Sequence, residues 1–391
     1  MNYPKRAIGH RLLILFLLFT SLKASAEDAE ILVPSPPTIA ASSHILLDYN
    51  SGKVLAENNA DAKLAPASLT KILTVYVVFK EIKNGNLHLD DNVTISENAW
   101  KTSGSKMFIK VNDQVRVEDL LKGVIIQSGN DASVALAEHV GGNESTFAEL
   151  MNQHAARLGM TNSHFENSDG LPSESHYTTA RDLAKLTSAL IKEFPEYYPW
   201  FSLKEFTYNK ITQQNRNMLL SRDNSVDGVK TGHTEEAGYC LVASALREGM
   251  RLISVVMGTE SVNARANENQ TLLNYGFRFY ESHRLYEGNK TIQESRIWKG
   301  ATETVPLGLS EDLYATIPRR QYNDLKATID IDTQIIAPVK KGDKLGMVTV
   351  KLKNEIIANT NLISLQDVEK GGLIRRLYDS VLMLIRKNSG G

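Results

Sequence analysis

The stretch at residues 67–79 constrains the fold most, because its side chains are apolar almost all round. A helix without a polar face must be buried on every side, so it needs a large core around it. The chain can supply such a core, since 42% of its 391 residues are hydrophobic and 23% are charged, as in a folded soluble protein. This composition argues against a disordered chain, a fibrous repeat and a multi-span membrane protein.

Strand patterns occur at both ends of the segment around this helix. Near its start, residues 45–47 and 54–55 flank the turn N-S-G-K at 50–53, which predicts a hairpin. Near its end, residues 238–246 and 251–257 predict two strands. Helical patterns lie at residues 117–127, 131–140, 179–192 and 263–283. We therefore expect one α/β or α+β domain whose sheet joins strands that are distant in the sequence.

The pattern changes after about residue 286. Short strand-like runs recur roughly every ten residues, at 295–298, 313–317, 325–331 and 347–352, which predicts a small all-β sandwich or barrel. This module has no histidine, the commonest acid–base residue, because His283 is the last one in the chain. We expect it to act as a spacer or a docking module.

The last segment, residues 373–387, is amphipathic. On a helical wheel its apolar side chains fall within one arc, and four of its cationic residues lie on the other side. One interpretation is a helix packed on its own domain. The other, favoured by the cations and by the preceding Gly371-Gly372 pair, is a helix lying flat on an anionic membrane surface. A helix of about 15 residues is only about 22 Å long, too short to span a membrane.

The first 26 residues have the pattern of a secretory signal peptide. Basic residues at positions 5, 6 and 11 precede an apolar stretch at 12–22, and A-S-A at 24–26 supplies the small residues of a cleavage site. A membrane-spanning anchor is the alternative, but this apolar stretch is shorter than the roughly 20 residues that a span needs. Residues 27–43, with three prolines, are predicted to form an extended leader.

Removal of residues 1–26 makes the chain acidic. Four of the 44 Lys and Arg residues are lost and none of the 45 Asp and Glu residues, which leaves 40 against 45 and a net charge near −5. This balance gives no support for nucleic-acid binding. The single cysteine, Cys240, excludes an internal disulfide, and no H-E-x-x-H metal motif or G-x-x-x-x-G-K-[ST] phosphate loop occurs. We expect neither a metal nor another cofactor.

A serine and a lysine three residues apart, Ser68 and Lys71, lie at the start of the apolar stretch. On a helix this spacing brings both side chains to one face. Lysine can take the proton of a nucleophilic serine only where burial or a nearby cation lowers its pKa, and the apolar residues behind Lys71 supply that burial. The pattern alone is weak, because a helix-capping serine fits it too. A second S-x-x-K lies at 103–106, in a polar stretch that we predict to be a loop.

Two further short motifs could complete this pair. Ser128 and Asn130 lie in a break between two predicted helices, where a hydroxyl could relay protons and an amide could orient a substrate. Lys230 and Thr231 precede Gly232 near a predicted strand, and a cation and a hydroxyl on an edge strand suit an anionic carboxylate. Each motif by itself also fits an ordinary turn or an exposed strand edge.

In the order S-x-x-K, S-x-N, K-T-G, these motifs resemble the serine penicillin-recognising enzymes. The local sequences P-A-S-L-T-K at 66–71, S-G-N-D-A at 128–132 and D-G-V-K-T-G-H-T at 227–234 are similar to those of the low-molecular-mass D-alanyl-D-alanine carboxypeptidases. The resemblance covers nearly the whole chain.

This resemblance implies an α+β fold with three parts. A β-lactamase/transpeptidase-like catalytic domain, with an antiparallel sheet flanked by helices, would occupy residues 44–285. A small all-β domain would follow at 286–370, and an amphipathic membrane-anchoring helix at 371–391. The mature protein would be exported and would lie peripherally on the periplasmic face of the bacterial inner membrane.

The resemblance also implies catalytic roles. Ser68 would attack the penultimate D-alanine carbonyl of a peptidoglycan stem pentapeptide and form an acyl-enzyme, with Lys71 as its general base. Ser128 would pass a proton toward the leaving D-alanine, and Asn130 would hold the substrate amide. Water would then hydrolyse the acyl-enzyme, and β-lactam antibiotics would inhibit by acylating Ser68.

Substrate-binding roles follow in the same way. Lys230 and Thr231 would bind the terminal carboxylate, together with Arg265, whose surroundings are less motif-like. The backbone N–H groups of Ser68 and His233 would form the oxyanion hole, where each donor is worth about 3–4 kcal/mol.

Three alternatives accompany this hypothesis. A class A β-lactamase shares the serine and the lysine, but the E-x-x-L-N box that it needs is absent. A peptidoglycan-binding protein without activity is disfavoured by the intact Ser68, Lys71 and Lys230. A D,D-endopeptidase acting on cross-linked stems stays open, because both activities break a peptide bond after D-alanine.

Overall fold

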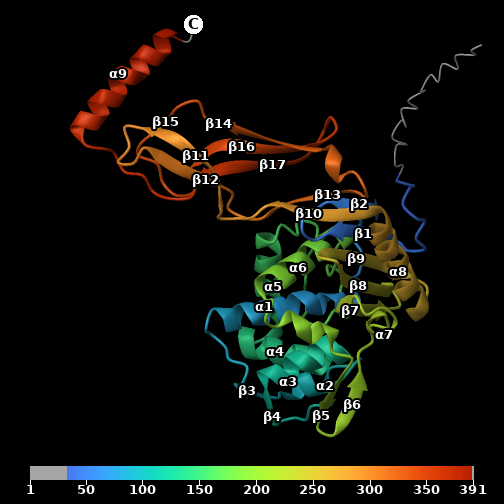
Figure 1. Ribbon diagram of the computed structural model, residues 1–391. Helices are drawn as coiled ribbons and strands as arrows, with labels where there is room; N and C mark the ends of the chain where they lie inside the picture. The colour runs from blue at the N-terminus through green and yellow to red at the C-terminus, as the bar shows by residue number, and fades with distance from the viewer. Residues whose placement is uncertain (1–32, 390–391) are drawn as a thin grey trace, which may run out of the picture. The chain divides into compact units, whose positions relative to one another are not determined.

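The computed structural model describes residues 33–389, with side chains described as far as residue 385 (Figure 1). The predicted signal peptide at 1–26 lies outside the described residues, as does the first part of the predicted leader. Residues 33–42 form no helix or strand.

A five-stranded antiparallel sheet forms the centre of the part of the chain that precedes residue 280. In spatial order its strands are β2 (Val54–Asn58), β1 (Ser43–Asp48), β9 (Met250–Thr259), β8 (Gly238–Arg247) and β7 (Val226–Thr234). β1 pairs with β9 along its whole length, so the first and last strands of this segment meet in one sheet, as predicted. β7 lies at one edge, and one side of it is open.

Helices cover both faces of this sheet (Figure 1). Successive side chains of a strand point to opposite faces, and this alternation divides the core in two. Ile45 packs with α1 (Lys71–Lys83) and α6 (Ala180–Glu193), whereas its neighbour Leu46 packs with α8 (Val262–Phe279). The predicted α+β class, with an antiparallel sheet flanked by helices, is confirmed.

The other elements of this part surround α1 or lead into the sheet. They are the 3₁₀ turns η1 (Ala67–Thr70) and η3 (Tyr198–Ser202), the π-helical turn η2 (Gly123–Gln127), the helices α2 (Glu97–Lys101), α3 (Val117–Lys122), α4 (Asn130–Gly141), α5 (Glu144–Arg157) and α7 (Leu219–Arg222), and the short strand pairs β3 (Asn92–Thr94) with β4 (Gln114–Arg116) and β5 (Glu205–Tyr208) with β6 (Ile211–Gln214).

Three predicted helices differ from the observed ones in detail. The helix predicted at 67–79 begins as η1 and becomes α-helical at Lys71, and the one at 117–127 is α3 followed by η2. The helix predicted at 263–283 is wrong at its end, because α8 stops at Phe279 and β10 (Tyr280–Tyr286) begins at the next residue. β10 pairs with β13 (Leu313–Pro318), a distant partner that local periodicity cannot reveal.

The chain after α8 is all-β up to its last helix. Besides the β10–β13 pair it forms a six-stranded sheet in the order β14 (Leu325–Ile331), β16 (Lys344–Leu352), β17 (Glu355–Ser364), β12 (Thr304–Gly308), β11 (Thr291–Trp298) and β15 (Ile335–Ile336), with the 3₁₀ turn η4 (Tyr322–Asp324) before β14. This sheet has its own hydrophobic core, which includes Val305, Leu307 and Val348. The prediction of a small all-β module is confirmed, while the residue bounds given for the domains stay predictions.

The described chain ends in α9 (Leu373–Ser389), the helix predicted after the Gly371-Gly372 pair. Among the helices of residues 33–389, none has the length and the apolar character needed to cross a membrane.

Candidate active site

Ser68 and Lys71 are in direct contact at the junction of η1 and α1. Lys71 Nζ donates hydrogen bonds to Ser68 Oγ at 3.1 Å, to Asn130 Oδ1 at 2.7 Å and to the backbone oxygen of Asp169 at 2.5 Å. The lysine side chain is fully buried, whereas Ser68 is half-buried and faces the surface. The amine of Lys71 is therefore shielded from solvent, and its hydrogen bond to Ser68 links it to the protein surface.

The burial of Lys71 prepares it to act as a base. Burial is the main cause that lowers the pKa of Lys71 to about 8; the Asp169 carboxylate opposes the shift and the Arg216 guanidinium adds to it. An ordinary lysine, with a pKa of about 10.4, is almost entirely protonated at neutral pH. A pKa near 8 leaves a useful fraction of the amine neutral, with a lone pair that can take a proton from Ser68.

Two glycines allow other segments to approach the serine closely. Gly170 has a φ of +82°, and a Cβ there would lie 1.8 Å from the backbone oxygen of Ala67. At Gly232 on β7, a Cβ would lie 3.0 Å from the backbone oxygen of Pro66. Larger residues at these positions would push the loop and the strand away from the turn that carries Ser68.

A second serine–lysine pair faces the first. Ser128 follows η2 in the left-handed conformation, with a φ of 65°, and Lys230 on β7 donates to its Oγ at 2.9 Å. Lys230 is buried, and its pKa is lowered well below the ordinary value, first by burial and then by the nearby charges of Lys71, Arg216 and Arg265. The charge of Lys71 thus disfavours the charged form of Lys230.

A cavity of about 660 Å³ opens over both pairs. The residues that line it come from loops and elements far apart in the sequence: Ser68, Gly104, Ser105, Ser128, Arg216, Thr231, Gly232, His233, Tyr239, Val262 and Arg265. Of the eight residues singled out from the sequence, five line the cavity. Asn130, Lys71 and Lys230 stand behind it and are connected to it by the hydrogen bonds described above.

The sequence candidate with the weakest motif, Arg265, is well placed at the cavity wall. Its Nη1 donates to the backbone oxygen of Gly232 at 2.9 Å, and its guanidinium lies 5.7 Å from the ring centre of Tyr239. The exposed ring of His233 stacks on the same tyrosine, with the ring centres 3.9 Å apart. Burial lowers the pKa of Arg265, but a guanidinium keeps its positive charge in proteins, so this wall is cationic.

Several cavity residues were not found from the sequence. Arg216 lies in a polar stretch without a motif, and Tyr239 and Val262 carry no local signal of function. The loop at 103–106 was correctly expected to be a loop, yet Gly104 and Ser105 line the cavity. Its contact with Asn130, whose backbone N–H donates to the oxygen of Ser105 at 2.7 Å, is a tertiary one.

Asn130 is engaged at both ends of its amide. Its Oδ1 accepts from Lys71, and its Nδ2 donates to the backbone oxygen of Ser103 at 2.7 Å. One N–H of the amide remains for another partner. In the described part of the chain, no group of three or more His, Cys, Asp or Glu side chains is arranged to hold a metal ion.

Comparison with known proteins places this geometry in a family. Residues 31–261 match the peptidase S11 family, described as D-alanyl-D-alanine carboxypeptidase, and residues 280–370 match the C-terminal domain of penicillin-binding protein 5. The D-alanyl-D-alanine carboxypeptidase DacC of Escherichia coli (strain K12) is 46% identical over 377 residues, which cover 94% of this chain and 93% of the relative.

Solved structures agree with the sequence comparison. Penicillin-binding protein 5 from Haemophilus influenzae has 44% identity and a TM-score of 0.82, covering 86% of this chain and all of that one. Penicillin-binding protein D2 from Listeria monocytogenes, solved in the ampicillin-bound form, has 31% identity and a TM-score of 0.57, and it covers 62% of this chain and all of that one. With its family motifs gathered around one cavity, the chain belongs to the D-alanyl-D-alanine carboxypeptidase family of serine peptidases.

Proposed function

We propose that this protein is a serine carboxypeptidase that removes the terminal D-alanine from peptidoglycan stem pentapeptides. The observation that carries the proposal is the meeting of two serine–lysine pairs, Ser68 with Lys71 and Ser128 with Lys230, at one cationic cavity. The names of its relatives as D-alanyl-D-alanine carboxypeptidases support the substrate class.

The first step is acylation of Ser68. Neutral Lys71 takes the proton of Ser68 Oγ, and the oxygen attacks the carbonyl of the penultimate D-alanine. The N–H groups of Ser68 and of His233, which lies on the open edge strand β7, stabilise the resulting oxyanion. The bond to the terminal D-alanine then breaks.

The second pair serves the leaving group and the carboxylate. Ser128, held by Lys230, passes a proton to the amine of the departing D-alanine. Lys230 and Thr231 bind the terminal carboxylate, and Arg265 strengthens the positive potential at that end of the cavity. Asn130 uses its remaining N–H to hold the substrate amide. The arriving carboxylate also favours the charged form of Lys230, whose pKa burial lowers.

Hydrolysis of the acyl-enzyme by water completes the cycle. A β-lactam mimics the D-alanyl-D-alanine end and acylates Ser68 in the same way, and the ampicillin-bound relative supports this reaction class. An endopeptidase would form the acyl-enzyme from a cross-linked stem peptide. A β-lactamase would form it from a β-lactam and hydrolyse it rapidly.

The test is release of D-alanine from purified stem pentapeptide by the wild type and by Ser68→Ala. We expect release by the wild type alone, and absence of release by both would contradict the proposal. Cross-linked muropeptides in the same assay measure endopeptidase activity. Rapid turnover of penicillin without a lasting adduct would instead identify a β-lactamase.

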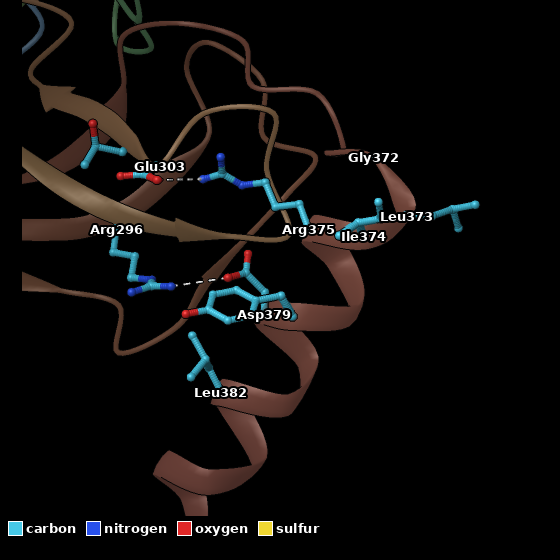
Figure 2. A pocket seen from close by; sticks show the side chains of 10 residues that line it. Arg296, Glu303, Gly372, Leu373, Ile374, Arg375, Asp379 and Leu382 are labelled. Carbon is cyan, nitrogen blue, oxygen red and sulfur yellow. Dashed lines mark hydrogen bonds and ion pairs between the residues drawn. The ribbon is translucent and has the colours of Figure 1, made fainter.

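We further propose that α9 lies on the surface of the bacterial inner membrane, on its periplasmic side. The helix docks on its own domain through a polar residue, because Asp379 is buried and its Oδ1 lies 3.2 Å from Arg296 Nη2 (Figure 2). The Oδ2 of Asp379 also accepts from the backbone N–H of Lys299 at 2.6 Å. The apolar arc is left uncovered, with exposures of 56–87% at Leu373, Ile374, Leu377, Tyr378, Val381, Leu384 and Ile385.

An exposed apolar arc beside cationic side chains suits an anionic lipid surface. We expect a mature chain without residues 372–391 to leave membranes while it keeps its activity on soluble peptides. Sedimentation with vesicles containing anionic lipid measures attachment. Continued binding of the truncated chain would rule out α9 as the anchor.

A further inference from the structure

Two large aromatic side chains beside the catalytic cavity are exposed to solvent. Trp100 is 41% exposed and Phe108 is 50% exposed, and together with Lys101, Lys106, Ile109 and Lys110 they line a depression of about 490 Å³. We call these six residues the Trp100–Phe108 surface. The proposed reaction uses none of them, and exposed aromatic residues gathered at one place mark interaction sites.

The exposure of Phe108 is imposed by the backbone. Phe108 has a φ of 67°, a left-handed conformation that costs a bulky residue roughly 1–3 kcal/mol. The fully buried carboxylate of Asp131 holds it there, since it accepts from the N–H groups of Met107 at 2.8 Å, Phe108 at 2.9 Å and Ile109 at 3.4 Å. Met107 and Ile109 are buried on either side, so the ring between them points outward.

Helix α4 fixes both aromatic residues relative to the catalytic centre. Asn130 and Asp131 at its start hold the loop that bears Phe108. One turn from its end, Glu138 accepts from Ser96 Oγ at 2.5 Å and from Asn98 Nδ2 at 2.9 Å, which ties α2 and hence Trp100 to the same helix. The surface and the Asn130 amide therefore belong to one rigid unit.

The Trp100–Phe108 surface and the cavity share one loop. Gly104 and Ser105 line the cavity, and the next residue of the same loop, Lys106, lines the depression. A ligand seated at Ser68 that extends past Gly104 and Ser105 would reach Trp100 and Phe108. The proposed substrate is of this kind, because its stem peptide is attached to a long glycan strand.

We propose that the Trp100–Phe108 surface binds the glycan strand of peptidoglycan while the stem peptide occupies the cavity. Flat aromatic rings stack on the apolar faces of pyranose sugars, and rigid exposed aromatic residues lose little entropy when they bind. Lys110, which makes no ion pair with any described residue, complements the carboxylates of neighbouring stem peptides, whereas Lys101 pairs with Glu97 and Lys106 Nζ donates to the backbone oxygen of Trp100. The inference rests on the proposed function for the identity of the polymer.

The test compares a polymeric and a short substrate. The variants are Trp100→Ala and Phe108→Asn, the latter because asparagine tolerates the left-handed conformation. On intact sacculi we expect each variant to lower kcat/KM by about tenfold, the loss typical of an interface anchor, with no change beyond about twofold on a soluble acyl-D-Ala-D-Ala peptide. Tyr322→Ala, which removes a ring of equal exposure from η4, should change neither.

Labelling of Ser68 by a fluorescent penicillin, together with the thermal unfolding temperature, checks that each variant is folded. Equal losses on both substrates would mean that the surface only supports the cavity, and no loss on sacculi would mean that it binds no glycan; either result overturns the inference. Co-sedimentation with sacculi in a Ser68→Ala background tests binding without turnover. It therefore separates failure of this surface from failure of the proposed carboxypeptidase activity.

Discussion

Lys71 Nζ lies 2.7 Å from the Oδ1 atom of Asn130, and this contact determines where the lone pair of the lysine can point. Asn130 Oδ1 and the backbone oxygen of Asp169 can only accept hydrogen bonds, whereas the hydroxyl of Ser68 can also donate. A neutral Lys71 keeps its two N–H groups on the two acceptors. Its lone pair is then directed to Ser68, which is the geometry that a general base needs.

The first prediction concerns the pH dependence of acylation. Because only neutral Lys71 can take the proton, the rate at which a penicillin acylates Ser68 should rise with pH through about 8 and level off above it. At pH 6 the rate should be about 100-fold below the plateau. Stopped-flow measurement with a fluorescent penicillin gives this profile. A flat profile between pH 6 and 9 would exclude Lys71 as the base.

The second prediction is that Asn130→Asp shifts this profile to higher pH. A carboxylate 2.7 Å from the amine stabilises the ammonium form, and such a neighbour raises a lysine pKa by about 1–3 units. At pH 7 acylation should slow by at least about tenfold, with recovery at alkaline pH. Asn263→Asp is the matched control, since its Oδ1 already accepts from Arg222 and Asn263 is not among the hydrogen-bond partners of Lys71 described above; a similar shift there would contradict the argument.

The third prediction separates two costs of replacing a glycine. Gly170→Ala places a Cβ 1.8 Å from the backbone oxygen of Ala67, so it should destabilise the fold by more than about 2 kcal/mol and impair acylation of Ser68. Gly142→Ala has a similar φ of +76° but no atom within 4 Å of the new Cβ. It should cost only about 1 kcal/mol and leave acylation unchanged. Equal unfolding midpoints in urea for the two variants would refute the packing argument.

The fourth prediction concerns acid stability and His176. Its Nε2 lies 2.8 Å from Oγ1 of Thr70, the residue before Lys71, and burial lowers the pKa of His176 from 6.5 to about 4. Between these values the unfolded chain binds a proton that the folded chain does not, so stability falls as the pH drops from about 6.5 to about 4. The loss amounts to about 3 kcal/mol at most.

His176→Gln removes this titration. As the pH falls, the wild type should lose this stability and the variant should not. The difference between their unfolding free energies, measured in urea from pH 4 to pH 7, should therefore become smaller at low pH. The other histidines with lowered pKa values, His44 and His154, are present in both proteins and cancel. A difference that is constant over this range would show that His176 does not titrate as expected.

The sequence by itself determined the local parts of this site. The three-residue spacing of Ser68 and Lys71 puts them on one helical face whatever surrounds them. The apolar run behind them required a buried helix, and α1 is buried over most of its length. The motif order also pointed to Ser128 and Lys230 as separate site residues, although nothing local says that the two side chains meet across 102 residues of chain.

Tertiary structure decided the other parts of the site, the end of α8 and the orientation of α9. Tertiary contacts join segments that share no sequence pattern. Arg216 and the loop at Gly104 reach the cavity, and the backbone oxygen of Asp169 reaches Lys71, through packing of distant loops. Such contacts leave no periodicity in the sequence. The end of α8 was mispredicted for the same reason, since Tyr280 pairs with a strand that follows much later. The amphipathic pattern predicted α9, but only the docking of Asp379 determined that its apolar arc faces away from the protein.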